Sequence, residues 1–86
     1  MSRIRIADLI GQERAGDAVY VAPLPDGPIL VLQDSAIAIW EAVDGDGIDA
    51  IARRVGEMTG VDAPAVRDDV AHFVRTLVGR GLLVEY

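Results

Sequence analysis

Apolar and polar residues in the first third of the chain are arranged in short segments typical of β-strands. Arg3–Ile6 alternates polar and apolar residues, and Ala18–Ala22 is rich in β-prone side chains. Ile29–Gln33 is apolar on both faces, which indicates a strand buried on both sides or one that leaves a face for a partner. The segment Ala7–Asp17 contains two glycines and four charged residues, which predicts a loop or irregular turn. Pro25–Pro28 supplies turn chemistry before the third strand.

Beyond residue 33, apolar residues recur every three or four positions, which predicts three helices. Short polar side chains can satisfy the free N–H groups at a helix start, and glycine commonly ends a helix. These signals give a first helix capped by Asp34 or Ser35 and ended by Gly45, a second from near Gly47 to Gly60, and a third from the cap Asp62, with Pro64 in its first turn, to about Arg80. Leu82–Val84 is expected to pack back on the core.

The third predicted helix has two apolar stripes. Val66, Val70, Phe73 and Leu77 form the expected core face. A second stripe, consisting of Ala71, Val74 and Val78 and extended by Arg67, lies roughly 80–100° around the helix from the first. This second stripe either packs on the sheet or forms one wall of a groove, and the sequence favours neither.

Composition narrows the classes of function. The chain has 86 residues, which is the size of one domain spanning residues 1–86, and it has no cysteine. All eight basic residues are arginine and the net charge is -6, which argues against a nucleic-acid partner. The N-terminus is too polar for a signal peptide and no apolar run is long enough to span a membrane, so we expect a cytoplasmic protein without a membrane partner.

No group of residues forms a convincing catalytic or metal-binding motif. His72 is the only histidine, and no second histidine or cysteine stands at a metal-ligand spacing from it. Asp68 and Asp69 are adjacent, but nothing in the sequence gives them the opposed environments that acid–base catalysis needs. Ser35 is better explained as a helix cap than as a nucleophile. We therefore expect a protein that is not an enzyme and has no metal or cofactor.

Several short motifs follow one another in a recognisable order. They are Leu32-Gln33-Asp34-Ser35-Ala36, Ile39-Trp40, Asp44-Gly45, Asp69-Val70, Phe73, Leu77 and Gly81-Leu82. This combination resembles the PqqD-like domains, which recognise the leader peptides of ribosomally made and later modified peptides. The resemblance implies an α+β, winged-helix-like fold in which a three-stranded antiparallel sheet is followed by three helices.

The resemblance also implies where a peptide binds. In these domains the leader adds as a strand at the edge of the third strand, against the third helix. Carried over to this chain, the peptide-binding residues are Ile29, Leu30, Val31, Leu32, Gln33, Arg67, Ala71, Val74 and Val78. The implied partners are a precursor peptide and a modifying enzyme, such as a radical SAM protein, or a leader peptidase. Under this hypothesis Val74→Asp weakens peptide capture and leaves the fold intact.

Two other functions share the expected fold. A winged-helix DNA-binding regulator would use the third helix, but that helix carries Asp68 and Asp69 beside its arginines. A dimerisation module would pair the edge of the Ile29–Gln33 strand with its own copy.

Overall fold

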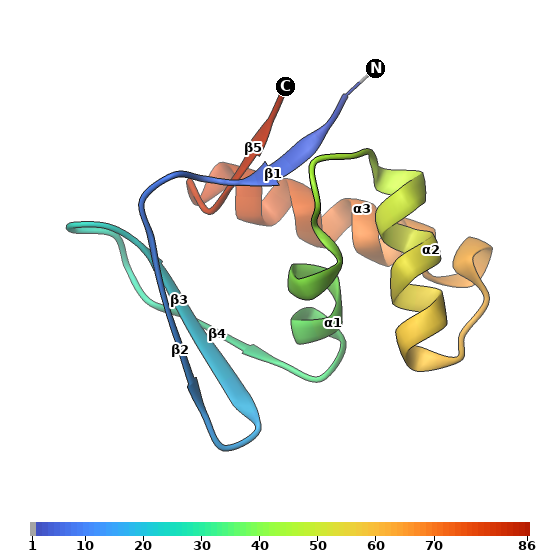
Figure 1. Cartoon of the computed structure of the whole chain (residues 1–86), viewed down its shortest axis with the longest axis horizontal. Helices are drawn as coiled ribbons and strands as arrows, with labels where there is room; N and C mark the ends of the chain where they lie inside the picture. Colours follow the sequence, from blue (N-terminus) through green and yellow to red (C-terminus); the bar gives the residue numbers. More distant parts are fainter. Residues whose placement is uncertain (1) are drawn as a thin grey trace.

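The structure is a computed structural model that describes residues 2–86, and it combines two small sheets with three helices (Figure 1). One sheet has the strand order β2-β3-β4 and the other pairs β1 with β5. The elements are β1 (Ile4–Ile6), β2 (Ile10–Ala15), β3 (Ala18–Pro23), β4 (Leu30–Gln33), α1 (Ser35–Ala42), α2 (Ile48–Thr59), α3 (Ala63–Gly79) and β5 (Leu83–Glu85). The predicted α+β class, with a three-stranded antiparallel sheet and three helices, is confirmed, and a second, two-stranded sheet is present besides.

The three-stranded sheet differs from the prediction in its first strand. The segment expected to be a loop contains β2, which pairs antiparallel with β3 from Ile10↔Pro23 to Ala15↔Ala18. A two-residue turn, Gly16-Asp17, joins these strands, and Gly16 has a φ of 59°, which glycine adopts at low cost. The loop prediction was wrong because β2 is polar and its strand structure depends on pairing with β3 rather than on its own residues.

The predicted strand at Arg3–Ile6 does form, as β1, but it lies in the other sheet. It pairs antiparallel with β5, with Ile4 opposite Glu85 and Ile6 opposite Leu83. Arg3 and Tyr86 continue the ladder, since each backbone N–H donates to the carbonyl oxygen of the other residue. The two ends of the described chain therefore lie side by side (Figure 1).

The helix bounds agree closely with the sequence signals, except at the end of α1, but neither of the predicted caps Asp34 and Asp62 makes a side-chain capping hydrogen bond. Gly60 ends α2 in a left-handed conformation, and Pro64 lies in the first turn of α3. Asp34 precedes α1 with a φ of 54° and makes no capping hydrogen bond through its side chain, so the predicted cap is absent. That helix ends at Ala42 rather than at Gly45.

One hydrophobic core joins the sheets and the helices. Trp40 on α1 is 2% exposed, and its indole Nε1–H donates a 3.0 Å hydrogen bond to Oε1 of Gln12 on β2. The core cluster contains Ile4, Val19, Val21, Leu32, Ile39, Trp40, Ala42, Ile51, Ala52, Val55, Val70, Val74, Leu77, Leu82 and Leu83. Residues from β1, β3, β4, β5 and all three helices contribute to this cluster.

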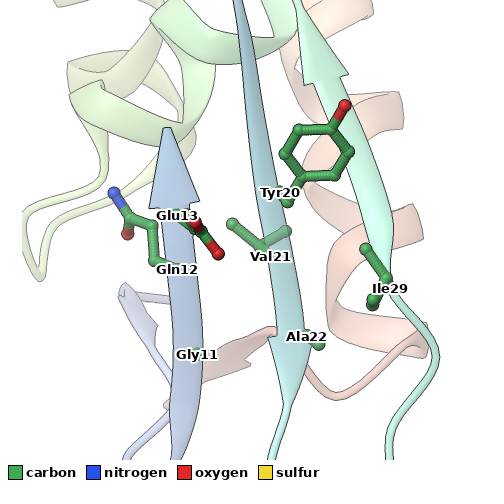
Figure 2. A pocket seen from close by; sticks show the side chains of 7 residues that line it. All are labelled: Gly11, Gln12, Glu13, Tyr20, Val21, Ala22 and Ile29. Atoms are coloured by element: carbon green, nitrogen blue, oxygen red, sulfur yellow. The ribbon is translucent and has the colours of Figure 1, made fainter. Parts of the chain in front are cut away.

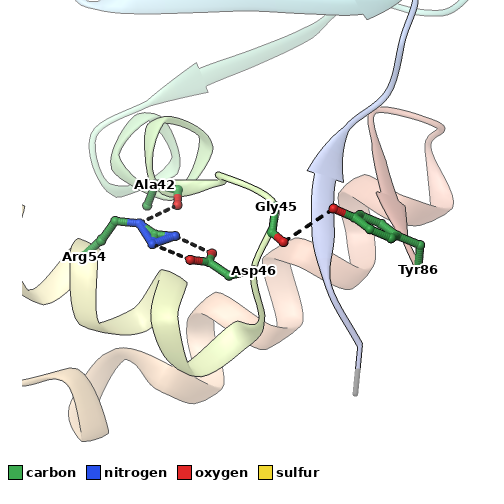
Figure 3. A network of polar contacts seen from close by, with 5 residues as sticks. All are labelled: Ala42, Gly45, Asp46, Arg54 and Tyr86. Carbon is green, nitrogen blue, oxygen red and sulfur yellow. Dashed lines mark hydrogen bonds and ion pairs between the residues drawn. The ribbon is translucent and has the colours of Figure 1, made fainter.

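A polar contact fixes the connection between α1 and α2 (Figure 3). The guanidinium of Arg54 on α2 donates to both carboxylate oxygens of Asp46, and its Nε–H donates to the carbonyl oxygen of Ala42 at 3.0 Å. A free carbonyl group at the C-terminal end of α1 thereby accepts a hydrogen bond from a positively charged side chain, and positive charge is favourable at a helix C-terminus.

Candidate functional site

The strand β4 lies at an edge of the three-stranded sheet. It pairs with β3 from Ala18↔Gln33 to Val21↔Leu30, and within residues 2–86 no strand pairs with its other edge. An unpaired edge presents backbone N–H and C=O groups that another extended chain can satisfy. The strand Leu30–Gln33 contains no charged residue, and the Ile29 side chain just before it is 68% exposed.

The opposite edge of the same sheet is protected. The strand β2 carries Glu13 and Arg14, and the Arg14 guanidinium lies 3.5 Å from the carboxylate of Glu41 on α1. Charged side chains on an edge strand disfavour pairing with another chain. Of the two edges of this sheet, only β4 has the features of one that accepts a strand.

Side chains of β4 alternate between the core and the solvent. Leu32 is 1% exposed and Leu30 is half-buried against the core cluster. Val31 is 47% exposed, and Gln33 is exposed as well. The five predicted residues of this segment therefore lie together at the edge, although Leu32 is itself part of the core.

The second stripe of α3 lies elsewhere. Ala71 and Val74 are buried, at 6% and 1% exposure. Val74 and Val78 border a small hollow of about 130 Å³ whose other lining residues include Ile4 on β1 and Ile48 on α2. The stripe thus packs on α2 and on the sheet formed by β1 and β5, whereas the sequence alternatives were the predicted three-stranded sheet or a groove.

Arg67, which extends this stripe, is engaged with α2. Its Nε–H donates to a carboxylate oxygen of Asp49, and both side chains are well exposed. The hydrogen bond that Arg67 donates to Asp49, and then the negative charge of Asp49, raise the pKa of the Arg67 guanidinium. This contact directs Arg67 toward Asp49 on α2, on the same side of α3 as Val74.

The opposite flank of α3 has a different character. Phe73 and Val66 are half-buried and pack against the core cluster, and Asp69 and Thr76 are exposed. At 100° per residue, Phe73 lies about 100° around the helix from Val74. Sequence reasoning assigned Phe73 only to the core, whereas its side chain is half-buried at the border of the first stripe, next to the exposed polar residues.

The ionisable side chains of the described residues lie at or near the surface. No polar or charged residue among them is buried, and no three of their histidine and acidic side chains gather as a metal site would require. His72, Asp68 and Asp69 are all exposed on α3. The features of this region that could bind another chain are the unpaired backbone groups at β4 and the exposed apolar side chains of Ile29 and Val31.

A three-stranded antiparallel sheet that leads into three helices, with an apolar strand at its edge, defines an α+β domain compatible with a winged-helix-like architecture. The chain belongs to the PqqD family: residues 9–83 match that family, described as coenzyme PQQ synthesis protein D. The predicted family is confirmed, and it connects the chain with biosynthesis. Comparisons with curated proteins and with solved structures give no significant match. Within residues 2–86, no helix is both long enough and apolar enough to cross a membrane.

Proposed function

We propose that this protein binds the leader segment of a ribosomally made precursor peptide as an additional strand at the free edge of β4. The observation that carries this proposal is the difference between the two edges of the sheet. The β2 edge is charged, whereas β4 is uncharged and has exposed apolar side chains at Ile29 and Val31. Backbone hydrogen bonds along β4 would provide affinity, and alternate side chains would provide selectivity.

The inward-facing side chains of such a peptide would lie beside Leu30 and Leu32. The half-buried positions at the margin of the core, Leu30 on β4 and Phe73 on α3, are the residues that we assign to the apolar side of the groove. We assign this role to the flank of α3 that carries Phe73 and not to Ala71, Val74 and Val78. Those three residues form the second stripe, which packs on α2 and on the sheet formed by β1 and β5.

Binding at β4 would serve a modifying enzyme, such as a radical SAM protein, or a leader peptidase. Holding the leader makes the encounter between the enzyme and the attached core peptide effectively intramolecular, so a weak direct contact between them suffices. Affinity for the leader should be moderate, because ordering a flexible peptide opposes binding.

The experiment is calorimetric titration with leader segments of small precursor peptides encoded beside the gene, followed by an N-methyl scan of the one that binds. N-methylation removes one backbone donor at a time. In a peptide bound as an edge strand only every second N–H faces β4, so binding should be lost with a period of two residues.

Three results would count against the proposal. Uniform tolerance of N-methylation would mean that side chains alone hold the peptide. Absence of any peptide binding together with salt-dependent binding to duplex DNA would make the chain a regulator. If the free protein sediments as a dimer and the added peptide neither binds nor dissociates it, β4 pairs with its own copy.

A further inference from the structure

The face of the three-stranded sheet that points away from the core is apolar near β4. Tyr20 is 38% exposed on β3, and Val31 and Ile29 are more exposed still. Leu24, which is 51% exposed, lies over Gly11. A Cβ atom added at Gly11 would lie 3.3 Å from Cδ2 of Leu24. The solvent face of an antiparallel sheet is ordinarily polar, so this face is a departure that needs an explanation.

The exposed residues are aligned in rows across the strands. The register places Glu13 opposite Tyr20 and Tyr20 opposite Val31, which makes one row from β2 to β4. A second row runs from Gly11 to Ala22, and both residues line a shallow hollow of about 320 Å³ that Ile29 borders (Figure 2). The first row is polar at β2 and ends in Val31 at the open edge, and Ile29, which directly precedes β4, borders the hollow beside the second row.

A strand added at β4 would extend each row by one side chain. Side chains directly opposite on neighbouring strands have Cβ atoms about 4.5–5.5 Å apart, and aromatic or long side chains also reach the diagonal neighbour. The outward-facing residues of the peptide would therefore lie beside Val31 and Ile29, and the inward-facing residues beside Leu30 and Leu32. If the neighbouring side chains of the sheet were polar, as on the solvent face of an ordinary antiparallel sheet, the outward-facing residues of the peptide could be polar too.

We propose that the protein selects a peptide segment that is apolar on both faces, with β-branched or aromatic residues at the outward-facing positions beside Ile29 and Val31. This inference rests on the proposed function, because it assumes strand addition at β4. Cross-strand pairs of this kind change affinity by roughly 1.5- to 5-fold in Kd at each outward position. Two such positions would distinguish the recognised segment from an amphipathic strand of alternating pattern.

Selection from a displayed library of random 12-residue peptides tests this preference on three proteins: wild type, Val31→Arg and Val61→Arg. Val61 is a matched control, because it is 44% exposed, close to the 47% of Val31, but lies between α2 and α3. Native emission from Trp40, the only tryptophan, would verify that each variant is folded.

We expect wild type and Val61→Arg to enrich peptides with β-branched or aromatic residues at two alternate positions, in addition to the inward-facing set. In Val31→Arg, one of the outward positions should change from apolar to Asp or Glu, because opposite charges across a strand pair are favourable and an apolar side chain loses its contact. The inward-facing set should not change.

The possible failures are distinct. If peptides are enriched but their outward positions show no preference, or if Val31→Arg leaves that preference unaltered, this inference is wrong while strand addition survives. If no peptide is enriched by wild type, the proposed function fails and this inference fails with it. If Val61→Arg shifts the preference as Val31→Arg does, the effect is one of overall charge and the row across the sheet does not select.

Discussion

Replacing Val74 with aspartate tests whether the second stripe of α3 is core or groove, because the two roles predict opposite results. Val74 is 1% exposed. Removing its side chain from the core forfeits about 2 kcal/mol of apolar burial. A carboxylate cannot remain ionised at that position without a partner, and protonating a group of ordinary pKa 3.9 at pH 7 costs about 4 kcal/mol.

The sum, about 6 kcal/mol, is comparable to the total stability of about 4–13 kcal/mol expected for a domain of this length. We therefore expect Val74→Asp to be largely unfolded or severely destabilised at pH 7. The penalty should shrink as the pH falls, because the buried carboxyl is neutral in the folded state and also becomes neutral in the unfolded state near pH 4. By the same relation, about 3 kcal/mol should be recovered between pH 7 and pH 4.5.

Urea unfolding followed by Trp40 fluorescence measures both effects, with wild type at each pH as the reference. Trp40 is 2% exposed, so its emission reports loss of the core directly. The matched variant is Val31→Asp, which places the same side chain on the exposed edge and should cost at most about 1 kcal/mol. That variant should instead lose peptide binding. A Val74→Asp protein with a wild-type unfolding midpoint at pH 7 and no affinity for peptide would refute this reasoning and return the second stripe to the groove.

Two further substitutions test the polar contacts that support the site. Gln12→Ala should lower the free energy of unfolding by about 1–2 kcal/mol, because it leaves the buried indole N–H of Trp40 without its acceptor. The control Glu13→Ala, at the next residue, should have little effect. Equal losses of stability in urea unfolding would contradict this prediction. Arg54→Met should lower the free energy of unfolding by about 1–2 kcal/mol, because Asp46 and the last carbonyl of α1 lose their hydrogen-bond donor. The control Arg53→Met, at an exposed neighbouring position, should lower it far less. An equal, salt-independent decrease in both variants would show that the aliphatic part of the arginine side chain matters and its charge does not.

The sequence predicted the helices well because their signals are local. Gly60 and Pro64 each specify a backbone conformation on their own, and both lie where expected. The missed strand, β2, shows the limit of such signals. Its central residues Gln12, Glu13 and Arg14 are polar, and the Gly16-Asp17 turn and pairing with β3 make it extended. A two-residue glycine turn between possible strands was the available clue.

The candidate site was predictable in part for a related reason. The apolar stretch Ile29–Gln33 predicted a strand, whereas its place at the edge of the sheet was implied only by the family resemblance. The role of the second stripe of α3 depends on what packs against Val74, and that is decided by the pairing of β1 with β5. No local pattern reports a contact between segments from opposite ends of the chain.

The paired ends of the described chain make its topology nearly circular. Arg3 and Tyr86 exchange two backbone hydrogen bonds, so a short linker could join the ends while the chain is opened at another exposed turn. Opening it between Gly16 and Asp17 would make β3 the first element and β2 the last, with all strand pairings retained. In such a rearranged chain the β4 edge would still be the bare one. Its availability is a property of the three-dimensional arrangement and not of the order in which the elements are connected.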